Sequence, residues 1–358
     1  MKPTLRRVHR WLAFGLGALW LSQALTGLLM VFRWELDDAP IAAPAVPLDL
    51  DALGERIAAI DAERPARRVV QLFATGGVDG RYDLYVDDAD GNTDIVRIDG
   101  TGRVLRTRPS GHDYAAAGFI PNAATLHQTL FAGDTGKRIV GISGLFLLAT
   151  IVMGLVLAWP ARSAHWRSAL WPRAARPGAP RRYAWHRAAG LWLGAPAVVL
   201  LGAGVLMTFE SPLEHWLGQD GTPPELATAP ALTGRPIPPA QAFRTALEQF
   251  PSTELTGAAL PSTEQPWYRI RVRQPEEWRR VYGTTVVYVA AVDGRVLLVE
   301  DALDAPRERA FLSNLYAIHT GEVGGLAGRL LTLAIGAWLF TMLLLGFGLW
   351  SARRRPTR

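Results

Sequence analysis

Residues 139–161 have the sequence IVGISGLFLLATIVMGLVLAWPA, a run without a single charged side chain. About 20 apolar residues are enough for a helix to cross the hydrocarbon core of a lipid bilayer. The chain contains three more uncharged stretches of similar length, at residues 11–32, 188–209 and 330–352. The sequence therefore predicts a membrane protein with four transmembrane helices.

The chain of 358 residues is 49% hydrophobic and 20% charged, and it contains no cysteine. The absence of cysteine excludes disulfides, iron–sulfur clusters, thiolate zinc sites, catalytic cysteines and the covalent attachment of c-type haem. Any cofactor must therefore be held by other side chains. The first apolar stretch follows basic residues, as in a signal peptide, but it is longer than the roughly 7–15 apolar residues of such a peptide, so we interpret it as a transmembrane helix.

Charge is distributed unevenly along the chain. The N-terminal ten residues, the loop at 162–187 and the tail at 353–358 hold 15 basic residues and no acidic one. The long segments at 33–138 and 210–329 hold all 32 acidic residues. Because basic residues mark the cytoplasmic side of a membrane protein, we expect a multi-pass protein of the bacterial inner membrane. Both termini would lie in the cytoplasm, and the two long segments would lie in the periplasm.

Each long segment has the pattern of a small α+β module. The predicted elements are helices at 50–62 and 239–250 and strands at 69–74, 81–86, 94–105, 267–273 and 284–299. The fold class we expect is membrane α-helical, a four-helix transmembrane bundle built as two pseudo-symmetric halves, each with a small α+β periplasmic module. The expected segments are span 1 (1–33), the first module (34–136), span 2 (137–161), a cytoplasmic loop (162–184), span 3 (185–209), the second module (210–326), span 4 (327–352) and a cytoplasmic tail (353–358).

A sequence repeat relates the two halves and marks four histidines. The number of residues from His9 to Phe32 equals the number from His186 to Phe209. Each of these phenylalanines ends an odd-numbered span. In the same way, His127 and His319 stand at equal distances before glycines 154 and 346, near the ends of the even-numbered spans. Parallel repeats are related by an axis along the membrane normal, so the two members of each pair should face one another across that axis. We predict one bis-histidine site from His9 and His186 near the cytoplasmic face and another from His127 and His319 near the outer face.

Imidazole pairs of this kind suit only some metals. Imidazole binds zinc, copper, nickel or haem iron. A tetrahedral zinc site takes four ligands, whereas each pair offers two, and two axial imidazoles fit a six-coordinate haem b. One histidine at the end of a membrane helix is usually a simple interfacial residue, and it is the repetition that favours ligation. The candidate cofactor-binding residues and axial ligands, for two haem b groups in all, are His9, His186, His127 and His319.

The other three histidines and the catalytic residues are less well defined by the sequence. His112 and His165 are expected at the surface. His215 stands just outside the third span, and the sequence leaves open whether it serves the outer site, a substrate or neither. No catalytic residue is assigned. Bis-histidine iron has no open coordination position, so its natural function is the transfer of single electrons.

Several motifs resemble those of the PepSY-associated transmembrane family. The first motif is His9-Arg10-Trp11. The second is Leu126-His127, followed by glycines 133, 136 and 141 and by the end of the span at 154–159. The third has the same layout and runs from Ile318-His319 to Trp350. The two modules are similar to PepSY domains, whose Asp-Gly turns match residues 99–102 and 293–294. The resemblance covers essentially the whole chain. It implies a relationship to FoxB-type inner-membrane reductases, which reduce ferric siderophores in the periplasm, and it implies that the four matched histidines hold haem.

The expected function is therefore that of a haem b electron-transfer protein that reduces ferric siderophores in the periplasm and releases ferrous iron for uptake. No G-x-G-x-x-G motif follows a strand, so a separate cytoplasmic or quinol donor must supply the electrons. The expected partners are this donor, the ferric siderophore and the lipid bilayer, and not nucleic acid. One alternative is a non-redox regulatory or accessory protein whose modules bind a peptide or a protease. Another is an iron-siderophore permease, which the uncharged spans disfavour.

Overall fold

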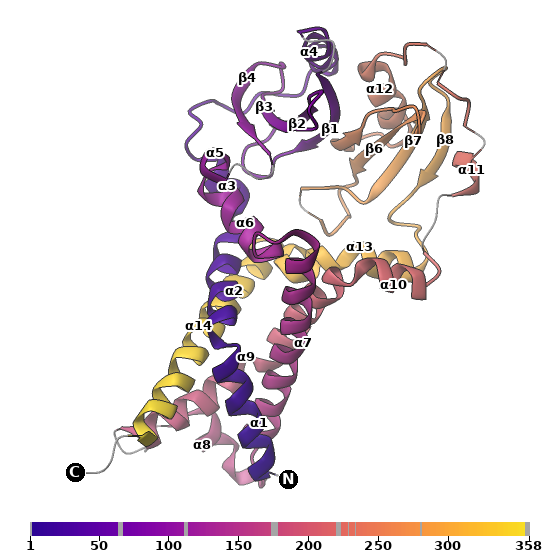
Figure 1. The fold of residues 1–358 in the computed structure, drawn as a ribbon. Helices are drawn as coiled ribbons and strands as arrows, with labels where there is room; N and C mark the ends of the chain where they lie inside the picture. The colour runs from indigo at the N-terminus through magenta and orange to yellow at the C-terminus, as the bar shows by residue number, and fades with distance from the viewer. Residues whose placement is uncertain are drawn as a thin grey trace. The chain divides into compact units, whose positions relative to one another are not determined.

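The chain forms two compact units in the computed structural model (Figure 1). The structure describes residues 2–63, 67–110, 114–172, 178–219, 223–227, 229–232, 234–279 and 281–354. The helical unit comprises Met1–Val31, Ala123–Leu213 and Leu315–Arg358. The sheet unit comprises Phe32–Asn122 and Glu214–Asn314.

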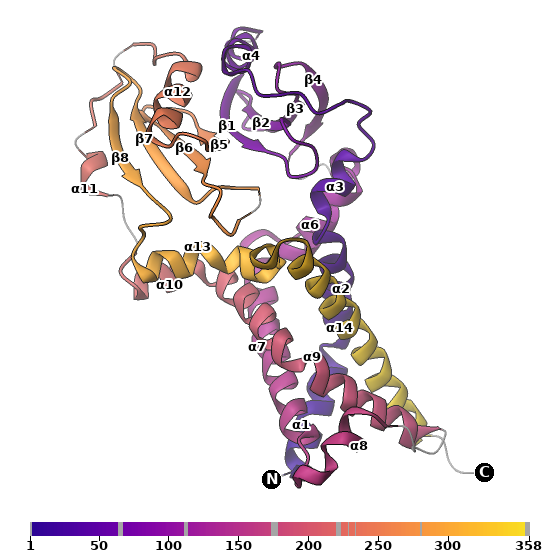
Figure 2. The ribbon, with the colours of Figure 1, turned by 180° about the vertical axis from the view of Figure 1, so that it is seen from behind.

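Three described helices of the helical unit are continuous, long and apolar enough to cross a membrane. They are α7 (Gly133–Ala158), α9 (Ala179–Thr208) and α14 (Gly325–Arg354). Helix α9 packs against both α7 and α14 (Figure 2). A Cβ atom at Gly194 of α9 would lie 2.7 Å from the side chain of Leu155 on α7, so glycine allows these two helices to approach closely.

The remaining helical elements around this unit are shorter. They are α1 (Lys2–Gly15), α2 (Gly17–Met30), α6 (Phe119–Thr129), η1 (Ser163–His165), α8 (Trp166–Leu170), α10 (Glu210–Trp216), α13 (Arg307–Thr320) and η2 (Glu322–Gly324). Helices α6 and α13 begin in the sheet unit and end in the helical unit.

The first predicted span is broken, which corrects the expectation of a four-helix transmembrane bundle. Helices α1 and α2 meet at Leu16 with a bend of 65°. Leu16 has φ −107° and ψ 0°, outside the helical range, and glycines flank it on both sides. Each glycine lowers helix stability by about 1 kcal/mol relative to alanine, so the helix bends most easily here. The hydropathy of the uncharged run at 11–32 does not reveal this break, and the two glycines are the only sign of it in the sequence.

The strands of the two predicted modules form one sheet, so the expectation of two separate small α+β modules is also wrong. The strands are β1 (Arg68–Ala74), β2 (Tyr82–Asp87), β3 (Thr93–Ile98), β4 (Val104–Pro109), β5 (Glu254–Ala259), β6 (Trp267–Arg273), β7 (Thr285–Ala290) and β8 (Val296–Glu300). They form an eight-stranded sheet in the order β4-β3-β2-β1-β5-β6-β7-β8, with every neighbouring pair antiparallel.

The two halves of the sheet join where β1 pairs with β5. Phe73 of β1 lies directly opposite Gly257 of β5. A Cβ atom at Gly257 would fall 2.8 Å from the Phe73 ring, so only glycine leaves room for that ring. Pairing here covers two strand edges that separate modules would leave open to other chains.

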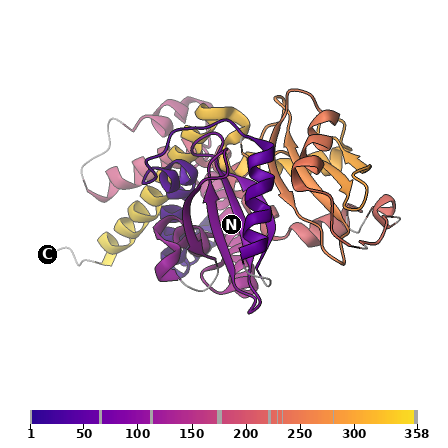
Figure 3. The ribbon, with the colours of Figure 1, turned by 90° about the horizontal axis from the view of Figure 1, so that it is seen from above.

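One face of the sheet is covered by helices α4 (Leu50–Glu63) and α12 (Pro239–Gln249), and Figure 3 shows α4 alongside the strands of the first half. The core there is apolar and fully buried, with contributions from both halves. Its largest members include Leu53, Ile57, Leu72, Leu84, Phe243, Tyr268 and Ile270. The helices touch where Gly54 meets Ala240, because a Cβ at Gly54 would lie 3.0 Å from the Cβ of Ala240. Both halves therefore share one core.

The helices predicted at 50–62 and 239–250 match α4 and α12 within one residue at each end. The strands predicted at 94–105 and 284–299 are each two strands joined by an Asp-Gly turn, as the turn residues suggested. Strand β5 was not predicted. Helices α3 (Arg33–Asp38), α5 (Tyr114–Ala117) and α11 (Pro224–Ala227) complete the sheet unit.

Candidate functional site

The four matched histidines lie in the helical unit as two pairs. The ring centres of His9, on α1, and His186, on α9, are 6.5 Å apart with an interplanar angle of 75°. Those of His127, on α6, and His319, on α13, are 6.3 Å apart with an angle of 31°. Each pair combines one histidine from each half of the chain.

Three of the four imidazoles are anchored through Nδ1. His9 Nδ1 donates to the Thr150 carbonyl and His319 Nδ1 to the Leu200 carbonyl, each over 2.9 Å. The Nδ1 of His127 lies 3.0 Å from the hydroxyl of Thr26, which donates its own proton to a carbonyl of α2. A proton held on Nδ1 leaves the lone pair on Nε2, the arrangement that metal-ligating histidines adopt.

Each histidine also packs against one glycine of its own half. A Cβ at Gly27 would lie 3.2 Å from His127 Cε1, and one at Gly154 would lie 3.2 Å from His9 Cε1. At Gly204 it would lie 2.5 Å from His319 Cε1, and at Gly346 it would lie 3.8 Å from His186 Cε1. For His9 and His319, the accepting carbonyl belongs to the residue four positions before the glycine. The sequence repeat contains these glycines, but their contacts with the histidines could not be read from it.

The two pairs fit a haem better than a bare metal ion. Among the residues that the structure describes, no group of three or more His, Asp or Glu side chains could hold a metal ion. The ring centres of the two pairs are 6.5 Å and 6.3 Å apart, which leaves room for one metal ion between the rings of each pair at the usual metal–nitrogen distance of about 2.1 Å. A porphyrin would supply the four ligands that the protein lacks.

Buried apolar side chains fill the interior of the helical unit between the levels of the two pairs. The cluster consists of Trp20, Ala24, Leu147, Ile151, Ala197, Ile335, Trp338 and Leu339. Both tryptophan indoles are held in place, because Trp20 Nε1 donates to the Ser143 carbonyl (3.2 Å) and Trp338 Nε1 donates to the Ala189 carbonyl (2.9 Å). Along α9, His186 and Leu200 are fourteen residues apart, or about 21 Å at 1.5 Å per residue.

Two of the other three histidines lie within the described residues. His165 is exposed in η1, as expected. His215 is exposed on α10 and belongs to the sheet unit. His112 lies outside the described residues.

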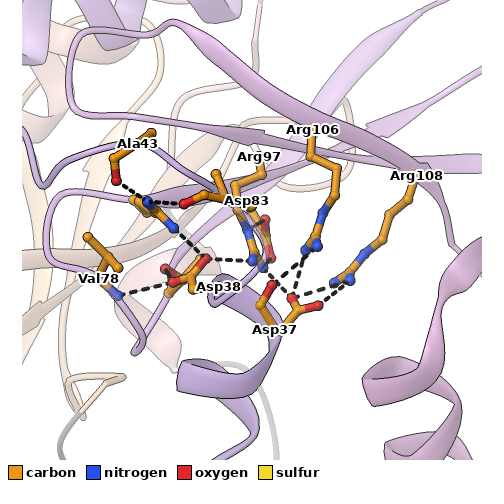
Figure 4. Close-up of polar contacts among 11 residues, drawn as sticks. Asp37, Asp38, Ala43, Val78, Asp83, Arg97, Arg106 and Arg108 are labelled. Atoms are coloured by element: carbon orange, nitrogen blue, oxygen red, sulfur yellow. Dashed lines mark hydrogen bonds and ion pairs between the residues drawn. The ribbon is translucent and has the colours of Figure 1, made fainter.

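The sheet unit contains a buried network of charges that the sequence patterns did not predict. Arg97 of β3 is 1% exposed and makes ion pairs with three carboxylates, as Figure 4 shows. Its distances are 2.8 Å to Asp37, 2.8 Å to Asp38 and 2.7 Å to Asp83. Arg81 makes a further ion pair with Asp38, at 3.1 Å. The network ties α3 to the strands, because two of its acids end that helix.

Asp37 is the most heavily paired acid of this network. Burial would raise its pKa, but the positive charges of Arg97, Arg108 and Arg106 outweigh that effect and hold the pKa below its ordinary value. Arg106 and Arg108 lie 2.8 Å and 3.0 Å from its carboxylate. The acidic pair at 37–38, directly after the first apolar stretch, was the available signal, but its arginine partners lie far along the chain, at positions 81–108.

On the second face of the sheet, one residue from each of the eight strands forms a row of cross-strand partners, and five of the eight are charged. Its members, as cross-strand partners, are Arg106, Arg97, Asp83, Phe73, Gly257, Arg271, Val286 and Glu300. Asp37 and Asp38 of α3 form ion pairs with Arg97, and Asp37 also pairs with Arg106. Arg271 donates to the Gly283 carbonyl over 3.3 Å, and no described carboxylate forms an ion pair with it. Burial, followed by the charges of Arg269 and Arg279, lowers the pKa of Arg271 to about 10. The positive charge around Arg271 is therefore poorly compensated by carboxylates of the described residues.

A family model for the PepSY-associated TM region matches residues 6–353. The match includes both histidine pairs, the break at Leu16 and the whole sheet. A search of curated proteins gives no match to this chain. Since the family model covers nearly the whole length, the chain belongs to the family of membrane proteins defined by the PepSY-associated transmembrane region.

Proposed function

We propose that this protein is a haem b electron-transfer protein of the bacterial inner membrane that reduces ferric siderophores in the periplasm. The observation that carries this proposal is the pairing of four repeat-related histidines at ring separations of 6.5 Å and 6.3 Å. His9 and His186 would hold one haem b, and His127 and His319 would hold the other. A bis-histidine haem, when bound, supplies reversible one-electron transfer without an open coordination position.

The chain's own residues orient the imidazoles. The carbonyls of Thr150 and Leu200 and the hydroxyl of Thr26 fix the proton on Nδ1 and hold each ring in one direction. The glycines at these places keep the space beside each ring open. Such hydrogen bonds also raise the basicity of the ligating nitrogen, so they favour the oxidised, more positive iron. A regulatory protein without a cofactor would have no need for this arrangement in both halves.

The interior cluster keeps water away from the region between the pairs. Trp20 is 1% exposed and Trp338 is 8% exposed. Rigid, dry packing lowers the cost of reorganising the surroundings when a charge moves. The pairs lie about 21 Å apart along α9, so the edges of the cofactors, rather than the ligands themselves, would have to approach one another inside this cluster.

We assign the ferric chelate to the second face of the sheet, around Arg269 and Arg271. Poorly compensated positive charge attracts an anionic chelate, and guanidinium groups bind carboxylate and catecholate oxygens well. One electron converts ferric to ferrous iron. Hard oxygen ligands hold the ferrous ion less tightly, so reduction releases the iron.

The experiment is to reduce the purified full-length protein, remove the excess reductant and mix it with ferric catecholate, citrate and hydroxamate complexes. Reoxidation, followed by the haem absorbance, should be rapid with the anionic chelates and absent with their gallium(III) analogues, which accept no electron. Arg271→Gln should slow it about tenfold, the effect of losing one charge-assisted contact. Arg295→Gln, at a side chain that is 58% exposed, is the matched control and should leave the rate of reoxidation unchanged. A colourless preparation from haem-replete cells would overturn the proposal and favour the regulatory alternative.

A further inference from the structure

One of the four paired histidines lacks the hydrogen bond that anchors the others. The Nδ1 atom of His186 is buried and has no hydrogen-bond partner among the described residues. The Nδ1 atoms of His9, His127 and His319 each have one, at 2.9 Å, 3.0 Å and 2.9 Å. Below, His9 and His186 are called the first pair, and His127 and His319 the second pair. The second pair is therefore anchored at both rings and the first pair at only one.

The sequence repeat shows which acceptor His186 fails to reach. For His9 and His319, the acceptor is the backbone carbonyl four residues before the glycine that touches the ring. For His186 the glycine is Gly346, so the equivalent carbonyl belongs to Met342. A Cβ at Gly346 would lie 3.8 Å from the ring, against 2.5 Å to 3.2 Å at the other three glycines. The His186 ring therefore stands farther from its glycine, which agrees with the missing hydrogen bond.

An acceptor at Nδ1 makes an imidazole a stronger ligand. It draws the Nδ1 proton away from the ring, so Nε2 becomes more basic and stabilises ferric iron more than ferrous iron. Removal of such a partner typically weakens a metal site by about 10–100-fold. His186 has no partner of this kind among the described residues, so the first pair should stabilise ferric iron less than the second pair does.

We propose that His186, as a positioning residue without an Nδ1 acceptor, gives the haem of the first pair a higher reduction potential than the haem of the second pair. This difference in potential rests on the proposed function, which puts one haem at each pair. We expect a tenfold difference in the one-electron equilibrium constant, or about 59 mV. One electron shared between the two sites, with one iron ferrous and the other ferric, would then occupy the second site about a tenth of the time. Fewer electrons are then exposed there to adventitious acceptors such as dioxygen.

The test is a spectroelectrochemical titration of the full-length protein in detergent, with dithionite as the reductant and ferricyanide as the oxidant. His127→Gln leaves only the haem of the first pair and His9→Gln leaves only that of the second, so each midpoint is measured alone. We expect the higher midpoint in His127→Gln. An equal or lower midpoint there overturns the difference in potential and leaves the proposed function standing. A parent protein that holds no haem overturns both.

A second set of variants tests whether the Nδ1 acceptor is the cause. The Thr26 hydroxyl donates to a carbonyl of its own helix and so accepts from His127 Nδ1. Thr26→Val removes this acceptor and should raise the midpoint of the second pair by about 59 mV, a tenfold change. Thr26→Ser keeps the hydroxyl and should match the parent. Thr129→Val, on the same helix as His127, is the control, because that hydroxyl bonds to the Thr125 carbonyl.

The opposite change supplies the acceptor that His186 lacks. A Cβ at Gly346 would be in ordinary contact with the His186 ring. A serine hydroxyl in a helix donates to a carbonyl one turn earlier, so Gly346→Ser can accept from Nδ1 as Thr26 does at His127. Its first-pair midpoint should fall by about 59 mV, whereas Gly346→Ala, which adds only a methyl group, should match the parent. Equal midpoints in these two variants, or an unchanged second-pair midpoint in Thr26→Val, overturn the proposal.

Discussion

The imidazole of His319 lies directly against Gly204 of α9. A Cβ atom there would fall 2.5 Å from Cε1 and 2.6 Å from Nδ1 of the ring, closer than real Cβ contacts allow. His319 Nδ1 donates at the same time to the Leu200 carbonyl, one turn earlier on α9. The glycine therefore sets the position of the imidazole.

Substitution of that glycine should displace the imidazole. Gly204→Ala is expected to reduce bound haem from two per protein toward one, because His319 cannot keep its position beside a methyl group. Haem content, measured as the pyridine haemochrome, checks this. Gly202→Ala is the control on the same helix, since a Cβ there meets no atom within 4 Å. Equal haem content in the two variants would show that the glycine does not position His319.

The buried network in the sheet unit should be important for stability. Arg97→Met leaves Asp37, Asp38 and Asp83 without their shared partner, and removal of one member of a buried ion pair costs about 3–5 kcal/mol. We expect a clearly lower melting temperature in thermal unfolding of the full-length protein. Arg103→Met is the control, because that side chain is 64% exposed and its ion pair contributes at most about 1 kcal/mol. Similar melting temperatures for both variants would contradict this role.

The pH dependence of stability follows from Asp37. Its pKa in the folded protein lies below the ordinary value of 3.8, because the charges of three arginines outweigh the effect of burial. The stabilisation is therefore fully present above pH 3.8 and is lost as the pH falls through the lower, folded-state pKa. Melting temperatures measured from pH 6 to pH 3 should fall at the acid end. The variant Asp37→Asn should be less stable than the parent at pH 6, and its melting temperature should fall less toward pH 3. Melting temperatures of parent and variant that fall in parallel with pH would contradict the prediction.

The junction of the two half-sheets should be sensitive to volume. Gly257→Ala places a methyl group 2.8 Å from the Phe73 ring, and overpacking of this kind costs about 1–3 kcal/mol. Phe73→Leu should recover part of that loss in the double variant, so the two effects should not add. Additive effects on the melting temperature would mean that β1 and β5 are not paired in solution.

Much of the candidate site could be predicted from the sequence, because the repeat keeps its spacing. His9 and His186 occupy matching positions before their spans, and so do the other two histidines, which is why the pairs could be named in advance. The anchoring hydrogen bonds could not be predicted. The acceptors are backbone carbonyls, such as that of Leu200, and a carbonyl has no residue type that marks it in the sequence.

The fold was predicted less well, for physical reasons that particular residues show. Hydropathy averages over a window, so the bend at Leu16 was invisible to it. Strand β5, with the sequence ELTGAA, has too few β-branched or aromatic residues to be recognised. Because β5 was missed, its pairing with β1 was missed as well, and the two halves were expected to be separate modules. The register of one sheet depends on contacts such as Phe73 with Gly257, which are far apart in the chain.

The central claim is that two histidine pairs each hold one haem b, and the most direct measurement is the haem content of single histidine variants with their redox spectra. The account predicts two haems in the parent protein. It predicts one haem in His127→Gln or His319→Gln, with the spectrum of the haem at His9 and His186 retained. It also predicts one haem in His9→Gln or His186→Gln, with the spectrum of the haem at His127 and His319 retained. His165→Gln, at an exposed histidine, should keep both. Two haems in every variant, or none in the parent, would contradict the account.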